Sequence, residues 1–468
     1  MQLDQDNNID YRQQLTDVMT TSLVGSVVET LGMTATVADF PAPVGAQVSI
    51  VRESGVQASG EVIGFRDGGA IVYLFTGTSG VRRGDRVRLD KTTRMLRAGG
   101  GLLGRVVNAH GRCIDGRPQP MMLARIPLDR DPPAPVERPR IREPLATGVH
   151  VIDAMLASGR GQRLGIFAGS GVGKSVLLGM MARHSDADVI VIGLIGERGR
   201  EVNEFIERDL GAEGLARSVV VVATSNEPAL TRVKAAYTAT AIAEYFRDKG
   251  RNVLLLVDSV TRLAMAQREI GLAAGEPPTT RGYPPSMFSL MPRLLERAGQ
   301  ARTGSITAYY SVLVEGDDEN EPVADTIRGL LDGHVWLSRK IAARGHFPAV
   351  DILQSISRLM NDITTPQHLA AAQTIRRVLA AYSEHEDLLS IGAYRRGSNR
   401  AVDAAVEMRE AIEELFRQGI DRAMPRDEVV AQLLKLAAQC QSRLASPAMG
   451  AAVPQVAVQH PAPMAMAG

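Results

Sequence analysis

The sequence predicts an α/β fold: a parallel-sheet core with an N-terminal small β-barrel and a C-terminal helical domain. Three observations predict it. Apolar, β-branched runs alternate with helical segments through the middle of the chain, short strand-like pieces precede them, and strand-like segments stop after about Thr365. Such alternation is typical of a parallel sheet with right-handed crossovers.

The predicted barrel occupies residues 24–96. Its short β-rich pieces are GSVVETLG, TATVADF, AQVSIV, GEVIGF, AIVYLF and DRVRLD. Gly, Asp or Ser interrupts them about every 8–12 residues, which is typical of a small barrel or sandwich. Residues 97–150 are rich in Gly, Pro and Arg, so we expect an extended connection there.

The core begins near Gly159. The runs RLGIFA, DVIVIGLIG, SVVVVAT, NVLLLVD and SITAYYSVLV have the composition of strands buried on both faces. Helical segments lie between them, and the longest begins at Pro228 and stops at Gly250. Pro at a helix start and Gly at its end support that assignment.

These patterns divide the chain into five predicted parts. They are an N-terminal segment (1–23), the barrel (24–96), the α/β core (97–365), a helical domain (366–445) and an Ala/Pro/Met-rich tail expected to be disordered (446–468).

Composition excludes several protein classes. Hydrophobic residues make up 45% and charged residues 22%, the balance of a globular protein. The net charge of +1 gives no global case for nucleic acid as a partner. Cys113 and Cys440 are far apart and belong to no metal or disulfide motif. With a polar N-terminus and no long apolar run, we expect a cytoplasmic protein.

The strongest motif is AGSGVGKS, residues 168–175, between a strand and a helix. Such a loop turns successive backbone N–H groups toward phosphate oxygens at a helix N-terminus. We expect Mg-ATP to bind here, with Lys174 on the β- and γ-phosphates and the Ser175 hydroxyl on Mg²⁺. The remaining contacts are expected from Gly169, Ser170, Gly171, Val172 and Gly173.

Acidic residues follow two of the predicted strands. Asp258 ends NVLLLVD and should point toward Mg²⁺ at the sheet edge. Glu197, in GERGRE, is the candidate that activates the attacking water. Arg198 and Glu201 are expected to position that water or hold magnesium-bound water, although a solvated charged turn is the competing interpretation. Arg358 is a candidate for stabilising phosphoryl charge from a neighbouring subunit.

Longer segments carry a family resemblance over about residues 24–440. They include GERGREVNEFIE, LLLVDSVTRLAMAQREIGLAAGEPPTTRGYPPS, SITAYYSVLVEGDDENEPVAD and HFPAVDILQSISR. The chain closely resembles the type III protein-export ATPases, relatives of the rotary ATP synthase alpha and beta subunits. IGAYRRGSN and SRLMNDI look more like the flagellar export ATPase than its virulence-secretion counterpart.

The resemblance implies roles for particular residues. Glu197 falls at the catalytic glutamate, and Arg358 at an arginine finger that reaches a neighbour's ATP. Phe347, in HFPAVD, matches an aromatic that packs on adenine, and Tyr394 lies in a segment expected near the nucleotide. For both aromatics, packing in a protein core is the competing interpretation.

The resemblance also implies partners. We expect a homohexamer, docked at the inner face of an export apparatus and attached to the membrane only through it. Its expected partners are a stator-like regulator on residues 1–23, a central-stalk subunit, an export gate and chaperone–substrate complexes, with no nucleic acid. Hydrolysis would release chaperones and feed unfolded substrates to the gate.

Three alternatives remain open besides a virulence-type secretion ATPase. A catalytic subunit of a rotary ATP synthase would share the phosphate machinery but not form a ring alone. An RNA translocase would need exposed aromatics on the barrel, which holds few. A ring subunit that binds nucleotide without hydrolysis is disfavoured because Lys174, Glu197, Asp258 and Arg358 occur together.

Overall fold

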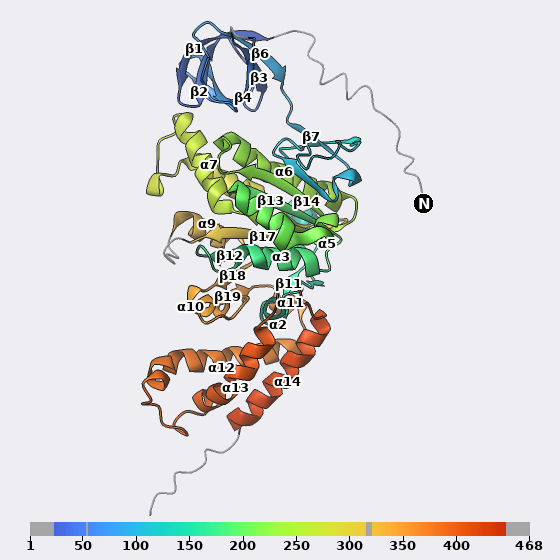
Figure 1. Cartoon of the computed structure of the whole chain (residues 1–468), viewed down its shortest axis with the longest axis vertical. Helices are drawn as coiled ribbons and strands as arrows, with labels where there is room; N and C mark the ends of the chain where they lie inside the picture. Colours follow the sequence, from blue (N-terminus) through green and yellow to red (C-terminus); the bar gives the residue numbers. More distant parts are fainter. Residues whose placement is uncertain (1–22, 53–54, 315–320, 446–468) are drawn as a thin grey trace, which may run out of the picture.

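The computed structural model describes residues 23–52, 55–314 and 321–445. The barrel, the central sheet with its helices, and the helical region follow one another along the long axis (Figure 1). This arrangement confirms the predicted fold class.

Six strands close the barrel in the order β1-β2-β5-β4-β3-β6. Apolar side chains such as Val37, Val48, Val62 and Val72 fill its interior and are fully buried. The strands are β1 (Val24–Leu31), β2 (Thr34–Ala38), β3 (Gln47–Val51), β4 (Gln57–Arg66), β5 (Gly69–Leu74) and β6 (Arg86–Lys91).

A nine-stranded sheet forms the core, in the order β19-β18-β12-β17-β15-β13-β14-β8, with β16 also pairing β17. All pairs from β18 to β8 along this order are parallel, whereas β18 and β19 are antiparallel. The strands are β8 (Arg105–Asn108), β12 (Arg163–Ala168), β13 (Val189–Glu197), β14 (Ser218–Thr224), β15 (Asn252–Asp258), β16 (Gly299–Gln300), β17 (Ser305–Leu313), β18 (Gly333–Leu337) and β19 (Val350–Ser357).

Residues 97–150 are more structured than the expected extended connection. Within them β8 joins the edge of the main sheet. Two small antiparallel pairs also form, β7 (Met95–Ala98) with β9 (Ala124–Pro127) and β10 (Pro144–Leu145) with β11 (Ser158–Gly159). The strand β8 is only four residues long, so it is too short to give a clear apolar run in the sequence.

Side chains of each core strand alternate between two hydrophobic layers. Leu254 and Leu256 pack with α3 on one face, and Leu255 and Val257 pack with α6 and α7 on the other. Full burial of each such side chain contributes about 1.5–3 kcal/mol. This burial on both faces explains why the predicted strands read as continuous apolar runs.

Helices cover both faces of the sheet and form the C-terminal region (Figure 1). They are α2 (His150–Met155), α3 (Lys174–His184), α4 (Gly199–Glu204), α5 (Gly211–Ala216), α6 (Ala229–Asp248), α7 (Val260–Ala273), α8 (Pro285–Leu295), α9 (Pro322–Leu330), α10 (Arg339–Ala343), α11 (Met360–Ile363), α12 (Pro366–Ser390), α13 (Arg400–Phe416) and α14 (Arg426–Ala445). Four short helical segments lie between these elements: the 3-10 helices η1 (Gly100–Leu102), η2 (Pro135–Glu137) and η4 (Thr280–Gly282), and the π-helix η3 (Phe205–Leu210).

The helical region packs against the sheet rather than standing apart. Ile375, Ile412 and Leu433, one from each of α12, α13 and α14, belong to the same hydrophobic layer as α3. Thr365 caps α12 by accepting a hydrogen bond from the His368 amide. No helix among the described residues is long and apolar enough to cross a membrane.

The structure therefore does not test the expectations for residues 1–23 and 446–468, which lie almost wholly outside the described residues.

Candidate active site

The loop between β12 and α3 has the backbone of a phosphate cradle. Gly171 and Gly173 have φ angles of 81° and 92°, in the left-handed region that favours glycine. Helix α3 begins at Lys174, so its first amides are free to bind an anion. A Cβ on Gly169 would lie 2.6 Å from the Arg339 guanidinium, so the Arg339 side chain would have to move for any larger residue there.

A cavity of about 540 Å³ opens over this loop. Most of the predicted site residues line it, namely Gly169, Ser170, Gly171, Gly173, Lys174, Ser175, Glu197, Arg198 and Glu201. Val172 does not, since its side chain is 3% exposed and packs in the hydrophobic layer beneath. Only its backbone is available to a ligand.

Lys174 and Asp258 face each other at the sheet edge. The Lys174 Nζ lies 2.5 Å from the Asp258 Oδ1, which also accepts a hydrogen bond of 2.7 Å from the Ser311 hydroxyl. Asp258 ends β15, and Ser311 lies on the adjacent parallel strand β17. The carboxylate is 3% exposed, so the ion pair compensates a charge held out of water.

Glu197 ends β13 and is 9% exposed. Burial, then the nearby Asp258 carboxylate, raises the pKa of Glu197 to about 7, while Lys174 and Arg262 act in the opposite direction. The Arg262 Nε lies 3.1 Å from the Glu197 Oε1. A carboxyl group with such a pKa exchanges a proton near neutral pH, as a general base requires.

Arg198 and Glu201 lie on the rim of the cavity. Arg198 is the residue before α4, and its Nη1 lies 3.4 Å from the Glu201 Oε1. Their side chains are 76% and 46% exposed. An ion pair so exposed holds neither group firmly, and Glu201 also forms a hydrogen bond with the Glu197 side chain.

Three further arginines that the sequence interpretation missed also line the cavity, Arg208, Arg262 and Arg339. Arg262 lies in the first turn of α7, four residues after Asp258, and that spacing could have identified it. Arg339 begins α10 after β18 and lies against Gly169. No local sequence pattern identifies Arg339, because it reaches the loop only through the pairing of β18 with β12 in the sheet.

Phe347 lies beside the loop. Its ring is 3.7 Å from the position of a Cβ on Gly173, and the residue is 45% exposed. The Phe347 carbonyl accepts a hydrogen bond from the Gln418 amide, which ties this segment to the helical region. Because the Phe347 ring is exposed beside the loop, its apolar face is available to stack on the adenine ring of a nucleotide.

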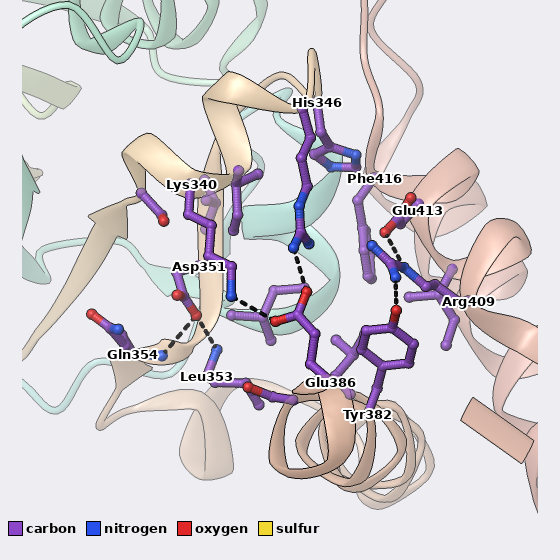
Figure 2. A pocket seen from close by; sticks show the side chains of 18 of the residues that line it. Lys340, His346, Asp351, Leu353, Gln354, Tyr382, Glu386, Arg409, Glu413 and Phe416 are labelled. Atoms are coloured by element: carbon purple, nitrogen blue, oxygen red, sulfur yellow. Dashed lines mark hydrogen bonds and ion pairs between the residues drawn. The ribbon is translucent and has the colours of Figure 1, made fainter. Parts of the chain in front are cut away.

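Behind this segment lies a second cavity of about 450 Å³, between α10 and β19 on one side and α12 and α13 on the other. Figure 2 shows Glu386 of α12 pointing toward the α10 segment. Its carboxylate is bound by Lys340, at 2.6 Å, and by Arg344. The segment between Arg339 and Phe347 therefore touches the phosphate loop and, through Glu386, the helical region.

Arg358 follows β19 and lies toward the end of the sheet that is farther from the phosphate loop. The pairing of Gly333 with Ser357 and of Leu337 with Ala168 places it four residues of strand away from the loop. That is roughly 13 Å along the strands. Arg358 is exposed and does not line the cavity of its own chain.

Tyr394 is not brought to this cavity. It lies between α12 and α13, where its hydroxyl donates to the Asn399 carbonyl at 2.8 Å and to the Asp403 Oδ1 at 3.0 Å. Its ring meets His385 edge-on. These contacts explain Tyr394 as a residue that orders the α12–α13 connection, the interpretation that competed with nucleotide contact.

The donor set at the loop suits Mg²⁺. A hydroxyl from Ser175 and a carboxylate from Asp258 are hard oxygen ligands, and magnesium sites in such enzymes take few protein ligands because phosphate oxygens and water supply the rest. The Asp258 carboxylate is held in place by Ser311. Ser175 and Asp258 are thus the residues that would hold the ion.

Three family models match the chain. They are the beta-barrel domain of the ATP synthase alpha/beta family over residues 27–89, the nucleotide-binding domain of that family over 148–357, and the T3SS EscN ATPase C-terminal domain over 364–435.

Individual proteins are similar over most of their length. The flagellum-specific ATP synthase of Bacillus subtilis is 50% identical over 414 residues, which cover 88% of this chain and 93% of the relative. The solved structure of assembled EscN, from the type III secretion system of enteropathogenic E. coli, has a TM-score of 0.84 at 43% identity and covers 88% of this chain and 100% of that one. EscN in complex with its central stalk EscO has a TM-score of 0.82 at 42% identity, with the same coverage.

Proposed function

This chain belongs to the ATP synthase alpha/beta family, among its type III export ATPases, and from that premise we propose that it hydrolyses Mg-ATP in a homohexameric ring to energise flagellar protein export. The observation that carries the proposal is the convergence of Lys174 and Glu197 on one cavity beside a phosphate loop, with the buried Asp258 carboxylate paired to Lys174 and close to Glu197.

ATP would lie with its phosphates on the loop and its adenine against Phe347. Lys174 would turn from Asp258 to the β- and γ-phosphate oxygens. Glu197 would orient the attacking water and accept its proton as the oxygen reaches phosphorus, and Arg262 would hold that carboxylate in place. Bound Mg²⁺ would supply neutralisation of the phosphate charge.

The site would be completed by a neighbouring chain. The position of Arg358 supports a role on another protomer's ATP, since it is exposed and distant from its own loop. Assembled EscN and its complex with EscO support a ring with a central-stalk partner. A ring in which each site spans two chains also explains how hydrolysis could shift an interface.

The finer assignments rest on the family resemblance. They are a stator-like regulator on residues 1–23, contact with an export gate, release of chaperones, and a cytoplasmic position at the inner face of the export apparatus. Arg198 and Glu201 would assist in placing water around the magnesium ion, a role that their rim position permits.

Mixed rings test the shared site. Arg358→Ala and Glu197→Gln rings should each be inactive, because one lacks the finger and the other the base. Rings rebuilt from an equal mixture should regain activity at about a quarter of the sites, those that pair an intact Glu197 with a neighbour's intact Arg358. Mixed rings verified by mass that stay inactive would contradict action between protomers.

Flagellar export is tested in cells. Deletion of the gene should abolish filament assembly, and the wild-type gene, but not one encoding Lys174→Ala, should restore it. Intact filaments together with loss of effector secretion would instead establish the virulence-type alternative.

A further inference from the structure

A third cavity, of about 460 Å³, shares no lining residue with the nucleotide cavity. It is lined by residues of the barrel strand β6, the β7–β9 pair, the turn after β8 and the helix α6. Its basic lining residues are Lys91, Arg97, His110, Arg112, Arg125 and Lys234.

No lining residue of this cavity is an aspartate or glutamate. Arg97 and Arg125 stand directly opposite each other in the β7–β9 register. Within the described part of the chain, Arg97 and Arg112 have no ion-pair partner for their side chains.

The floor of the cavity holds a buried cation. The side chain of Lys234 is 5% exposed, and no acceptor among the described residues lies at hydrogen-bond distance from its Nζ. Its nearest carboxylate oxygen, on Glu61, is 3.6 Å away, and Glu61 is itself bound by Arg94. The pKa of Lys234 is lowered, and burial is the largest cause of this shift. A buried ammonium so weakly satisfied favours an anion in contact with it.

His110 reports the same positive field. Loss of hydration first, and then the charges of Lys234 and Arg112, lower its pKa to about 4. The ring is therefore neutral at pH 7, and it adds a hydrogen-bonding group without a further charge.

We propose that this cavity is a second anion site that binds a small, soluble molecule carrying two or more phosphate groups. Its volume is that of a small-molecule site. Arginine guanidinium groups bind phosphate oxygens in pairs, and several converging cations suit a ligand with more than one charged group. The site differs from the phosphate loop because side chains, not backbone amides, supply its donors.

Calorimetric titration with inorganic tripolyphosphate tests the proposal. The full-length chain should carry Lys174→Ala, so that binding at the nucleotide loop is weakened. We expect one binding event per chain, with an affinity that falls as salt rises. Adding Arg97→Gln and Arg112→Gln should weaken it by at least about tenfold, because two charge-assisted contacts are lost. Both side chains are exposed, so the fold should be retained.

The matched control is Arg83→Gln, an exposed arginine of the barrel that does not line the cavity. It should leave the affinity unchanged within about twofold. Absence of binding at millimolar probe would overturn the proposal, as would equal affinity in the Arg97/Arg112 variant. An equal loss in the Arg83 variant would also overturn it, since general surface charge would then account for binding.

Discussion

The pH dependence of hydrolysis should report the protonation of Glu197. Burial and the Asp258 carboxylate place the pKa of this group at about 7. A general base acts only when ionised, so activity limited by Glu197 should rise with pH and level off above that value. The relevant quantity is kcat/KM, which reflects the free enzyme.

The size of the effect follows from this pKa. With a value near 7, about one eleventh of Glu197 is ionised at pH 6 and about ten elevenths at pH 8, so kcat/KM should rise about tenfold between them. Phosphate release can be measured at low ATP across that range, with ring mass and thermal unfolding checked at each pH. Glu197→Gln should bind ATP normally, lose about 10²–10⁴ in turnover, and show no such rise.

Two arginine variants separate the electrostatic cause from general damage. Arg262 favours the ionised carboxylate, so Arg262→Gln should move the pH midpoint upward. Arg198→Gln is the control, because Arg198 pairs with Glu201 instead and should reduce activity without moving the midpoint. A flat profile between pH 6 and 8 in the wild type, or a midpoint that Arg262→Gln leaves in place, would refute the assignment.

Three further substitutions test other parts of the site. Lys174→Ala should abolish hydrolysis and weaken ATP binding in a fluorescent-nucleotide titration, and wild-type turnover would remove the loop from the active site. Phe347→Ala should raise KM for ATP about tenfold with kcat little changed, because stacking binds substrate and transition state alike, whereas Phe347→Tyr should keep the wild-type KM. Glu386→Gln should lower stability at pH 7 by about 1 kcal/mol in a denaturant titration, and Glu384→Gln, which removes an exposed carboxylate with no ion-pair partner among the described residues, should not. Because Lys340 and Arg344 lower the pKa of Glu386, this loss should shrink as pH falls below about 4, and a loss independent of pH would contradict the ionic cause.

Much of the core could be predicted because each of its signals is local. Strands buried on both faces give continuous apolar runs, and the phosphate loop needs glycines at fixed positions such as Gly171 and Gly173. Asp258 and Glu197 could be placed at one edge of the sheet from the sequence, because each ends such a run and parallel strands bring their carboxyl ends together.

The remaining features depend on long-range contacts that leave no local pattern. Arg339 reaches the loop only because β18 pairs with β12. The edge strand β8 was missed because it is short and its neighbours in space are distant in the chain. For Tyr394 the sequence left two interpretations open, and its hydrogen bonds to Asn399 and Asp403 favour the one in which it orders the connection between α12 and α13.

The antiparallel return of β19 places Arg358 away from the phosphate loop of its own chain, so in the proposed ring each chain would offer a guanidinium group on one side and receive one on the other. In a closed ring such contacts all run in the same rotational sense. Substitution of Arg358 in one protomer would therefore inactivate the ATP site that it shares with the neighbour on one side and leave the site on the other side intact. Head-to-tail contacts of this kind would allow the sites to hydrolyse ATP one after another in a fixed order around the ring, whereas six independent sites would have no such order.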